Sequence, residues 1–156
     1  MKILVAIDFA EDDKKILEQG SRLGAAFSAT IILLHVTEAE VGQGFIAYEP
    51  DPLMGGIELD PQVMRESVAK RYQLEHNRLQ QFSEEIRSGG VDCVALLVPG
   101  DSVEVILQEA EKHSVDMIVL GSHGKGMAAR LLLGSTSEGV VRKSTRPVHI
   151  VPTRKK

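Results

Sequence analysis

The chain has 156 residues, of which 43% are hydrophobic and 26% charged, a size that suits one domain with its own core, spanning residues 1–156. The net charge of -4, the aromatic content of 4% and a clustering of positive charge only in the tail 152–156 exclude a nucleic-acid-binding face. No stretch approaches the roughly 20 apolar residues of a membrane span, and acidic side chains follow the N-terminus too early for a signal peptide. We therefore expect a soluble, cytoplasmic protein, in which the single cysteine, Cys93, is a buried thiol.

Five apolar runs predict strands. They contain Val, Ile and Leu with little polar alternation, which is typical of strands covered on both faces in a parallel sheet. In chain order, the predicted strands are residues 2–8, 30–36, 91–98, 116–121 and 147–151.

The segments between these runs have the periodicity of helices. The first predicted helix has one face made of Ile16, Gly20, Leu23 and Phe27. The second is longer, and its face is made of Met64, Val68, Tyr72, Leu79, Phe82 and Ile86. Gly89 and Gly90 then provide a C-terminal cap that ends the second helix.

Two further helices are predicted from capping signals. Asp101 and Glu104 have the spacing of a capping box, and the same spacing recurs at Ser135 and Glu138. The inward face of the third helix consists of Val103, Ile106, Leu107 and Ala110. Four strand–helix units closed by a fifth strand predict an α/β fold, with a doubly wound parallel sheet and helices on both faces.

Residues 37–60 form a long irregular connection that contains four glycines and two prolines. Its 24 residues are many for a connection in a compact domain. A variable surface loop is the favoured interpretation, and a lid is the alternative.

A glycine-rich stretch follows the fourth predicted strand. Ligands of open parallel sheets bind beyond the carboxyl ends of the strands, where Asp8 ends the first run and Gly121 the fourth. Gly121 and Gly124 allow the backbone to approach a bulky anion closely, and Gly134 and Ser135 return the chain to the start of a helix. The unpaired N–H groups and positive dipole end of that helix favour phosphate. The stretch therefore predicts a site for the phosphates of a nucleotide.

Other chemistries fit this stretch poorly. A Walker A loop fails because Gly126 is followed by Met127 instead of lysine. Residues 124–129 match a loose dinucleotide pattern but follow the fourth strand, without the acidic residue expected about 20 positions further on. Ser122 and His123 are adjacent and so unsuited to a catalytic pair, and the histidines lack metal-ligand spacing.

The pattern Gly121-x2-Gly124-x9-Gly134-Ser135, between "DMIVLG" and "EGVVRKSTRPVHIVP", resembles the nucleotide-binding signature of the universal stress protein family, in its ATP-binding branch. The resemblance extends over nearly the whole chain. It implies a Rossmann-like fold, similar to adenine nucleotide alpha hydrolases, with strand order 3-2-1-4-5. It also implies a homodimer formed through residues 147–151.

The resemblance further assigns roles in the site. Asp8 would bind the ribose, and the backbone of Val36 the adenine. Ala6 and Leu120 would be apolar walls, and Gly121 would contact the ribose. The phosphates would be held by Gly124, Gly134, Ser135, Thr136 and Ser137. The implied ligand is ATP, or ADP or AMP, with Mg²⁺ held through the phosphates; alternatively, Asp8 caps a helix without any ligand.

The chain departs from many relatives at Ala10, where they have serine. Glu11, Asp12 and Asp13 follow, and Asp12 is the candidate to cap the first helix instead. Three carboxylates would repel a triphosphate unless a divalent cation intervenes or they point to solvent. Lys125 and Arg130 either offset this charge or are solvated loop residues.

The favoured function is a nucleotide-binding regulatory module that binds ATP as a dimer and changes its interaction with an unidentified protein partner during stress. No catalytic residue is assigned, because no general base accompanies the glycines. Two alternatives remain open. One is a slow ATPase or adenylate-transferring enzyme with His123 as its base, and the other is a dimerisation protein that does not bind nucleotide.

Overall fold

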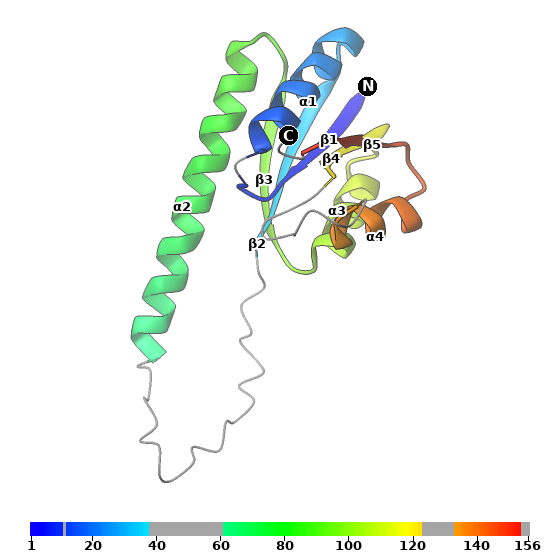
Figure 1. Ribbon diagram of the computed structural model, residues 1–156. Coiled ribbons are helices and arrows are strands. Elements are labelled where there is room, and N and C mark those ends of the chain that lie inside the picture. The colour runs from blue at the N-terminus through cyan, green and yellow to red at the C-terminus, as the bar shows by residue number, and fades with distance from the viewer. Residues whose placement is uncertain (11, 38–60, 123–132, 154–156) are drawn as a thin grey trace.

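The computed structural model describes residues 1–10, 12–37, 61–122 and 133–153 (Figure 1). Strands and helices alternate in these residues as the sequence predicts. The elements are β1 (Lys2–Ile7), α1 (Asp13–Phe27), β2 (Thr30–Thr37), α2 (Pro61–Ser88), β3 (Cys93–Pro99), α3 (Ser102–Lys112), β4 (Met117–Gly121), α4 (Ser135–Lys143) and β5 (Val148–Val151). The expected loop and lid at 37–60 lie outside the described residues, apart from Thr37, which is the last residue of β2.

The five strands form one parallel sheet in the order β3-β2-β1-β4-β5. The central strand β1 pairs with β2 as far as Ile7 opposite His35, and with β4 as far as Val5 opposite Val119. The chain first winds from β1 outward to β3, then crosses back to β4 and winds the other way. The α/β fold class and the predicted strand order are confirmed, and the winding direction reverses between β1 and β4.

Helices cover both faces of the sheet. Alternate residues of each strand point to opposite faces, and both sets are apolar, so each face is buried against helices. Ile3 and Val5 pack in one core with residues of α1 and α2, whereas Leu4 and Ala6 pack in another with residues of α3 and α4. Figure 1 shows the long helix α2 beside α1, with α3 and α4 across the sheet from them. Burial on both faces explains why the strands lack polar alternation.

Helix α1 packs closely on the sheet through two glycines. A Cβ added at Gly20 would lie 2.8 Å from Val5 Cγ2, so this face requires residues without side chains. The buried residues of α1 end at Gly24. Phe27, which was expected on this face, is 51% exposed. That expectation is wrong because Phe27 is the last residue of the helix, beyond the part that packs on the sheet.

Helix α2 has 28 residues and is therefore about 42 Å long, at a rise of about 1.5 Å per residue. On its expected face, Leu79 and Ile86 are buried, while Val68, Tyr72 and Phe82 are only partly so; the side chain of Met64 lies outside the description. The predicted glycine stop is confirmed. Gly90 has a φ of +86°, and its amide donates to the Arg87 carbonyl at 2.9 Å. The Val91 amide still bonds back to Ile86, which explains why β3 begins only at Cys93.

The helix caps follow the predictions in part. Asp101 is the N-cap of α3, and its Oδ1 accepts the Glu104 amide at 3.0 Å, as predicted. At α4 the N-cap is Gly134, without a side-chain bond, so the capping role predicted for Ser135 is wrong. Ser135 is already helical, and a hydroxyl inside the first turn cannot occupy the N-cap position. No helix in the described parts of the chain is long and apolar enough to cross a membrane.

Asp12 occupies the N-cap position of α1, but the cap that was expected of its side chain does not form. Its backbone is already in the α region, and its Oδ1 instead accepts a charged hydrogen bond from Lys15 Nζ at 2.7 Å. The negative charge of Asp12 is therefore paired within the first turn of the helix.

Candidate functional site

A cavity of about 530 Å³, including its open mouth, lies at the carboxyl edge of the sheet, where the winding direction reverses. This is where open parallel sheets bind ligands. The ends of β1, β2 and β4 contribute to it, together with α1 and the starts of α3 and α4. Its lining residues are Ala6, Ile7, Asp8, Ile16, Val36, Ser102, Ile106, Leu120, Gly121, Thr136 and Ser137.

The cavity brings together seven of the ten residues predicted for the site. These seven are Ala6, Asp8, Val36, Leu120, Gly121, Thr136 and Ser137. Of the other three, Gly134 is buried as the N-cap of α4, and Ser135 is exposed; neither lines the cavity. Gly124 lies outside the described residues, as do His123, Lys125 and Arg130.

Four lining residues were not predicted as part of the site: Ile7, Ile16, Ser102 and Ile106. Ile7 directly precedes Asp8, and Ser102 follows the end of β3, so their position at strand ends was a usable signal. Ile16 and Ile106 were predicted only as core residues of their helices. With Ala6 and Leu120 they give the cavity apolar walls, which suit a flat, weakly polar ring system.

Asp8 is the carboxylate of the cavity. It follows the last residue of β1, is half-buried, and its Oδ1 accepts the Ala10 amide at 3.1 Å. This short turn fixes the carboxylate at the strand end. The N-cap of α1 is Asp12, so Asp8 does not occupy the capping position that the alternative interpretation gave it.

A second carboxyl group, that of Asp13, lies beside Asp8. It is only 2% exposed, and neither of its oxygens has a hydrogen-bond partner among the described residues. Burial first, and the neighbouring charge of Asp8 second, raise the pKa of Asp13 to about 7. Asp13 is thus protonated in a large part of the molecules at neutral pH.

The start of α4 forms the opposite wall. Ser137 Oγ donates a 2.6 Å hydrogen bond to the carbonyl of Gly121 and so attaches the helix to the end of β4. The first intrahelical bond runs from the Glu138 amide to Gly134, so the amides of the preceding residues have no acceptor within the helix. These amides and the dipole of α4 make this wall suited to an anion.

Ser122 has a structural role next to this wall. Its hydroxyl lies 3.2 Å from Thr153 Oγ1 and accepts the Thr153 amide at 3.1 Å, while its carbonyl accepts the Gly134 amide at 2.7 Å. These bonds join the ends of β4 and β5 to the start of α4.

Val36 provides a backbone acceptor on the far side of Asp8. The carbonyl of Thr37 accepts the Gly100 amide at 3.1 Å and so points towards β3. Successive carbonyls of a strand point in opposite directions, so that of Val36 points towards β1. The β1–β2 pairing ends at Ile7 opposite His35, and the Val36 carbonyl therefore lies at the end of that ladder, beside the cavity.

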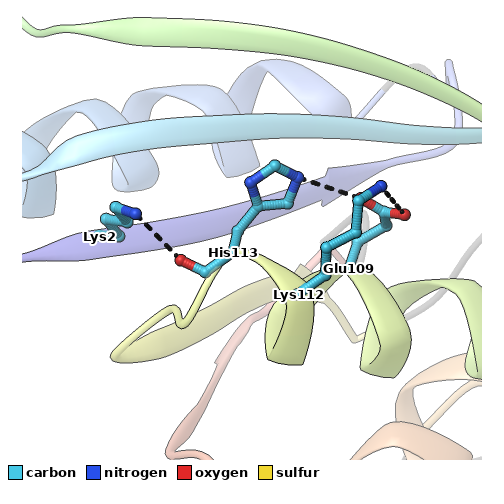
Figure 2. Close-up of polar contacts among 4 residues, drawn as sticks. All are labelled: Lys2, Glu109, Lys112 and His113. Carbon is cyan, nitrogen blue, oxygen red and sulfur yellow. Dashed lines mark hydrogen bonds and ion pairs between the residues drawn. The ribbon is translucent and has the colours of Figure 1, made fainter.

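The other notable charged cluster is remote from the cavity. Figure 2 shows Glu109 of α3 accepting hydrogen bonds from Lys112 Nζ, at 2.9 and 3.1 Å, and from His113 Nε2 at 3.1 Å. Lys2 Nζ donates to the carbonyl of His113 at 3.1 Å. Lys2 begins β1, so this cluster lies at the amino edge of the sheet. Within the described part of the chain, no three His, Cys, Asp or Glu residues are grouped to hold a metal ion.

The fold and the cavity define a class of protein: a doubly wound α/β protein with a cavity at its switch point. The chain belongs to the universal stress protein family, whose family model matches residues 1–152.

Individual relatives agree with this assignment. Universal stress protein MJ0577 of Methanocaldococcus jannaschii is 32% identical over 154 residues, which cover 96% of this chain and 93% of that protein. The MJ0577 structure is similar with a TM-score of 0.78 at 28% identity and covers 99% of this chain and 97% of its own.

Two more distant structures share the fold. A universal stress protein in complex with cAMP has a TM-score of 0.66 at 20% identity, with 99% of this chain and 98% of its own covered. A universal stress protein family protein of Arabidopsis thaliana with AMP bound has a TM-score of 0.63 at 21% identity, with 99% and 92% covered.

Proposed function

We propose that the cavity binds an adenine nucleotide, ATP in the first place, and that the protein is a regulatory module controlled by this ligand. The observation that carries the proposal is the convergence, in one cavity, of an apolar slot, a carboxylate and a helix N-terminus. Two distant relatives of the same fold, with cAMP and AMP bound, support the adenosine part of the ligand.

The strand order gives the ligand a direction. Along the carboxyl edge, β2, β1 and β4 follow one another, so Val36, Asp8 and Gly121 form a row. The adenine would lie at Val36, whose carbonyl can accept a hydrogen bond from an exocyclic amino group. The ribose hydroxyls would donate to Asp8. The phosphates would then lie against Thr136 and the free amides of α4.

Two of the three acidic residues after Asp8 are compatible with a polyphosphate, and the third, Glu11, lies outside the described residues. Asp12 is paired with Lys15 at 2.7 Å, and Asp13 is buried with its pKa raised to about 7. Neither presents a full free charge to the cavity. The described residues offer no cluster of metal ligands, so a Mg²⁺ ion would be held through the phosphates themselves.

We favour regulation over turnover. Among the described residues that line the cavity, Asp8 is the one with an ionisable side chain. A carboxylate engaged by ribose hydroxyls cannot also activate a water. The alternative of a slow ATPase depends on His123. Measuring phosphate release over hours, with His123→Ala as the control, tests it; release that requires His123 would favour the enzyme.

The assembly that we propose is a homodimer formed through β5. Within the described chain β5 pairs only with β4, so its outer edge is open to a second copy. The carbonyls of Pro147 and Val151 face β4, and by alternation the backbone groups of Ile150 face outward. Ile150→Pro should therefore convert dimers to monomers in light scattering while circular dichroism stays native; an unchanged dimer would contradict this interface.

Calorimetric titration with MgATP tests the nucleotide site. Wild-type protein should bind saturably, and more tightly than it binds MgGTP, because the guanine O6 would face the Val36 carbonyl. Asp8→Ala should weaken the binding of ATP and of adenosine by similar factors, since Asp8 contacts the ribose. Asp12→Asn is the matched control and should bind normally. Absence of saturable binding, or equal affinities of wild type and Asp8→Ala, would refute the proposal.

A further inference from the structure

Phe9, directly after Asp8, has an unusual backbone conformation. Its φ is +59°, in the left-handed region that bulky side chains rarely occupy. The conformation turns the chain sharply at the end of β1, so that the Ala10 amide reaches the Asp8 carboxylate at 3.1 Å. An unfavourable backbone conformation persists only where neighbouring groups hold it.

The groups that hold Phe9 come from two other elements. Its ring centroid lies 4.0 Å from that of His35 on β2, and the Cζ atom of Arg78 on α2 lies 4.8 Å from the Phe9 centroid. His35 is itself fixed, because its Nδ1–H donates to the carbonyl of Ile7 at 2.9 Å. The Phe9 ring is thus enclosed between a buried imidazole and an exposed guanidinium, a favourable cation–π arrangement.

We propose that Phe9, held by His35 and Arg78, is a positioning residue that presents the Asp8 carboxylate to the ribose of the nucleotide. This inference rests on the proposed nucleotide site and adds α2 to it. We call Phe9, His35 and Arg78 the Phe9 clamp. None of the three lines the cavity, so they act through Asp8 without touching the ligand. Arg78 links nucleotide affinity to the placement of the long helix.

The test replaces the exposed member of the clamp. Arg78→Met keeps the aliphatic stem but removes the charge above the ring, and it should weaken MgATP binding by about two- to fivefold in calorimetry. Arg78→Lys keeps a cation and should restore most of the affinity. Arg22 of α1 and Arg78 of α2 line one groove between the two helices, and both are exposed. Arg22→Met is therefore the matched control, because it changes the net charge equally.

A double-mutant cycle separates positioning from a direct charge effect. In an Asp8→Asn background, Arg78→Met should cause no further loss of affinity, because the clamp acts through the Asp8 side chain. Phe9→Leu should weaken binding in wild type and likewise have no effect in that background. Equal losses in both backgrounds, or unchanged affinity of Arg78→Met, would overturn the inference while the nucleotide site stands. No binding by wild type would overturn both.

Discussion

Asp13→Asn should stabilise the protein above neutral pH. The Asp13 carboxyl is 2% exposed, its oxygens have no hydrogen-bond partner among the described residues, and Asp8 lies beside it. Ionising such a group takes a charge out of water, and the neighbouring backbone of Asp8 and Phe9 offsets only part of that cost. Asparagine has nearly the same shape as the protonated acid but cannot ionise.

The size and sign of the effect follow from the pKa of Asp13. The folded state raises this pKa from 3.8 to about 7, so between these values the folded protein holds a proton that the unfolded chain releases. The free energy of unfolding therefore falls as pH rises through this window and is level above it. A shift of about three units, at about 1.36 kcal/mol each, corresponds to at most about 4 kcal/mol at pH 8.

Urea denaturation of wild type and Asp13→Asn at several pH values from 5 to 8 measures this. The stability difference should grow with pH in favour of the variant, and Asp12→Asn, which replaces a neighbouring carboxylate that is paired with Lys15, is the matched control. A wild-type-minus-variant difference that stays constant with pH would show that Asp13 does not titrate in this range, and the argument from burial would fail.

Three further experiments test other parts of the structure. Ser137→Ala removes the 2.6 Å bond to the Gly121 carbonyl and should lower the free energy of unfolding by about 1–3 kcal/mol in urea denaturation, because a buried acceptor loses its partner. Asp101→Ala removes the side-chain cap on the Glu104 amide and should lower the free energy of unfolding by about 1 kcal/mol in the same assay. An unchanged denaturation midpoint would show that this cap does not stabilise the protein. Burial raises the pKa of the Cys93 thiol, so its reaction with a disulfide reagent should be slow in native protein and fast in denaturant, and equal rates would contradict its burial.

The sheet was predictable because its strands are buried on both faces, which leaves continuous apolar runs such as residues 30–36. Periodicity alone does not tell which strands are neighbours; the order came from the resemblance to a family. Phe27 and Ser135 were misplaced for a similar reason. Each residue fits a local sequence pattern. However, the tertiary structure sets the residue at which a helix leaves the sheet and the exact residue at which a helix begins.

The site was predictable where it depends on strand ends and glycines. Asp8 and Gly121 end two strands that flank the reversal of winding, so their meeting follows from topology. Ile16 and Ile106 were missed as lining residues, because their role depends on how α1 and α3 meet the sheet edge. The burial of Asp13 had no signal either, since acidic residues at the start of a helix are usually solvated.

The residues around Asp8 explain why two buried features occur together at one strand end. A carboxylate that binds ribose must be held still and must keep its acceptor oxygens available. The Phe9 clamp provides the first condition through the left-handed turn. Asp13 bears on the second, because burial raises its pKa to about 7 and a carboxyl that keeps its proton adds no negative charge beside Asp8. Loss of the Asp13 proton at high pH would add a second negative charge beside Asp8. Asp13 belongs to α1 and Arg78 to α2, so both helices influence the Asp8 carboxylate, one through a neighbouring charge and the other through the Phe9 ring.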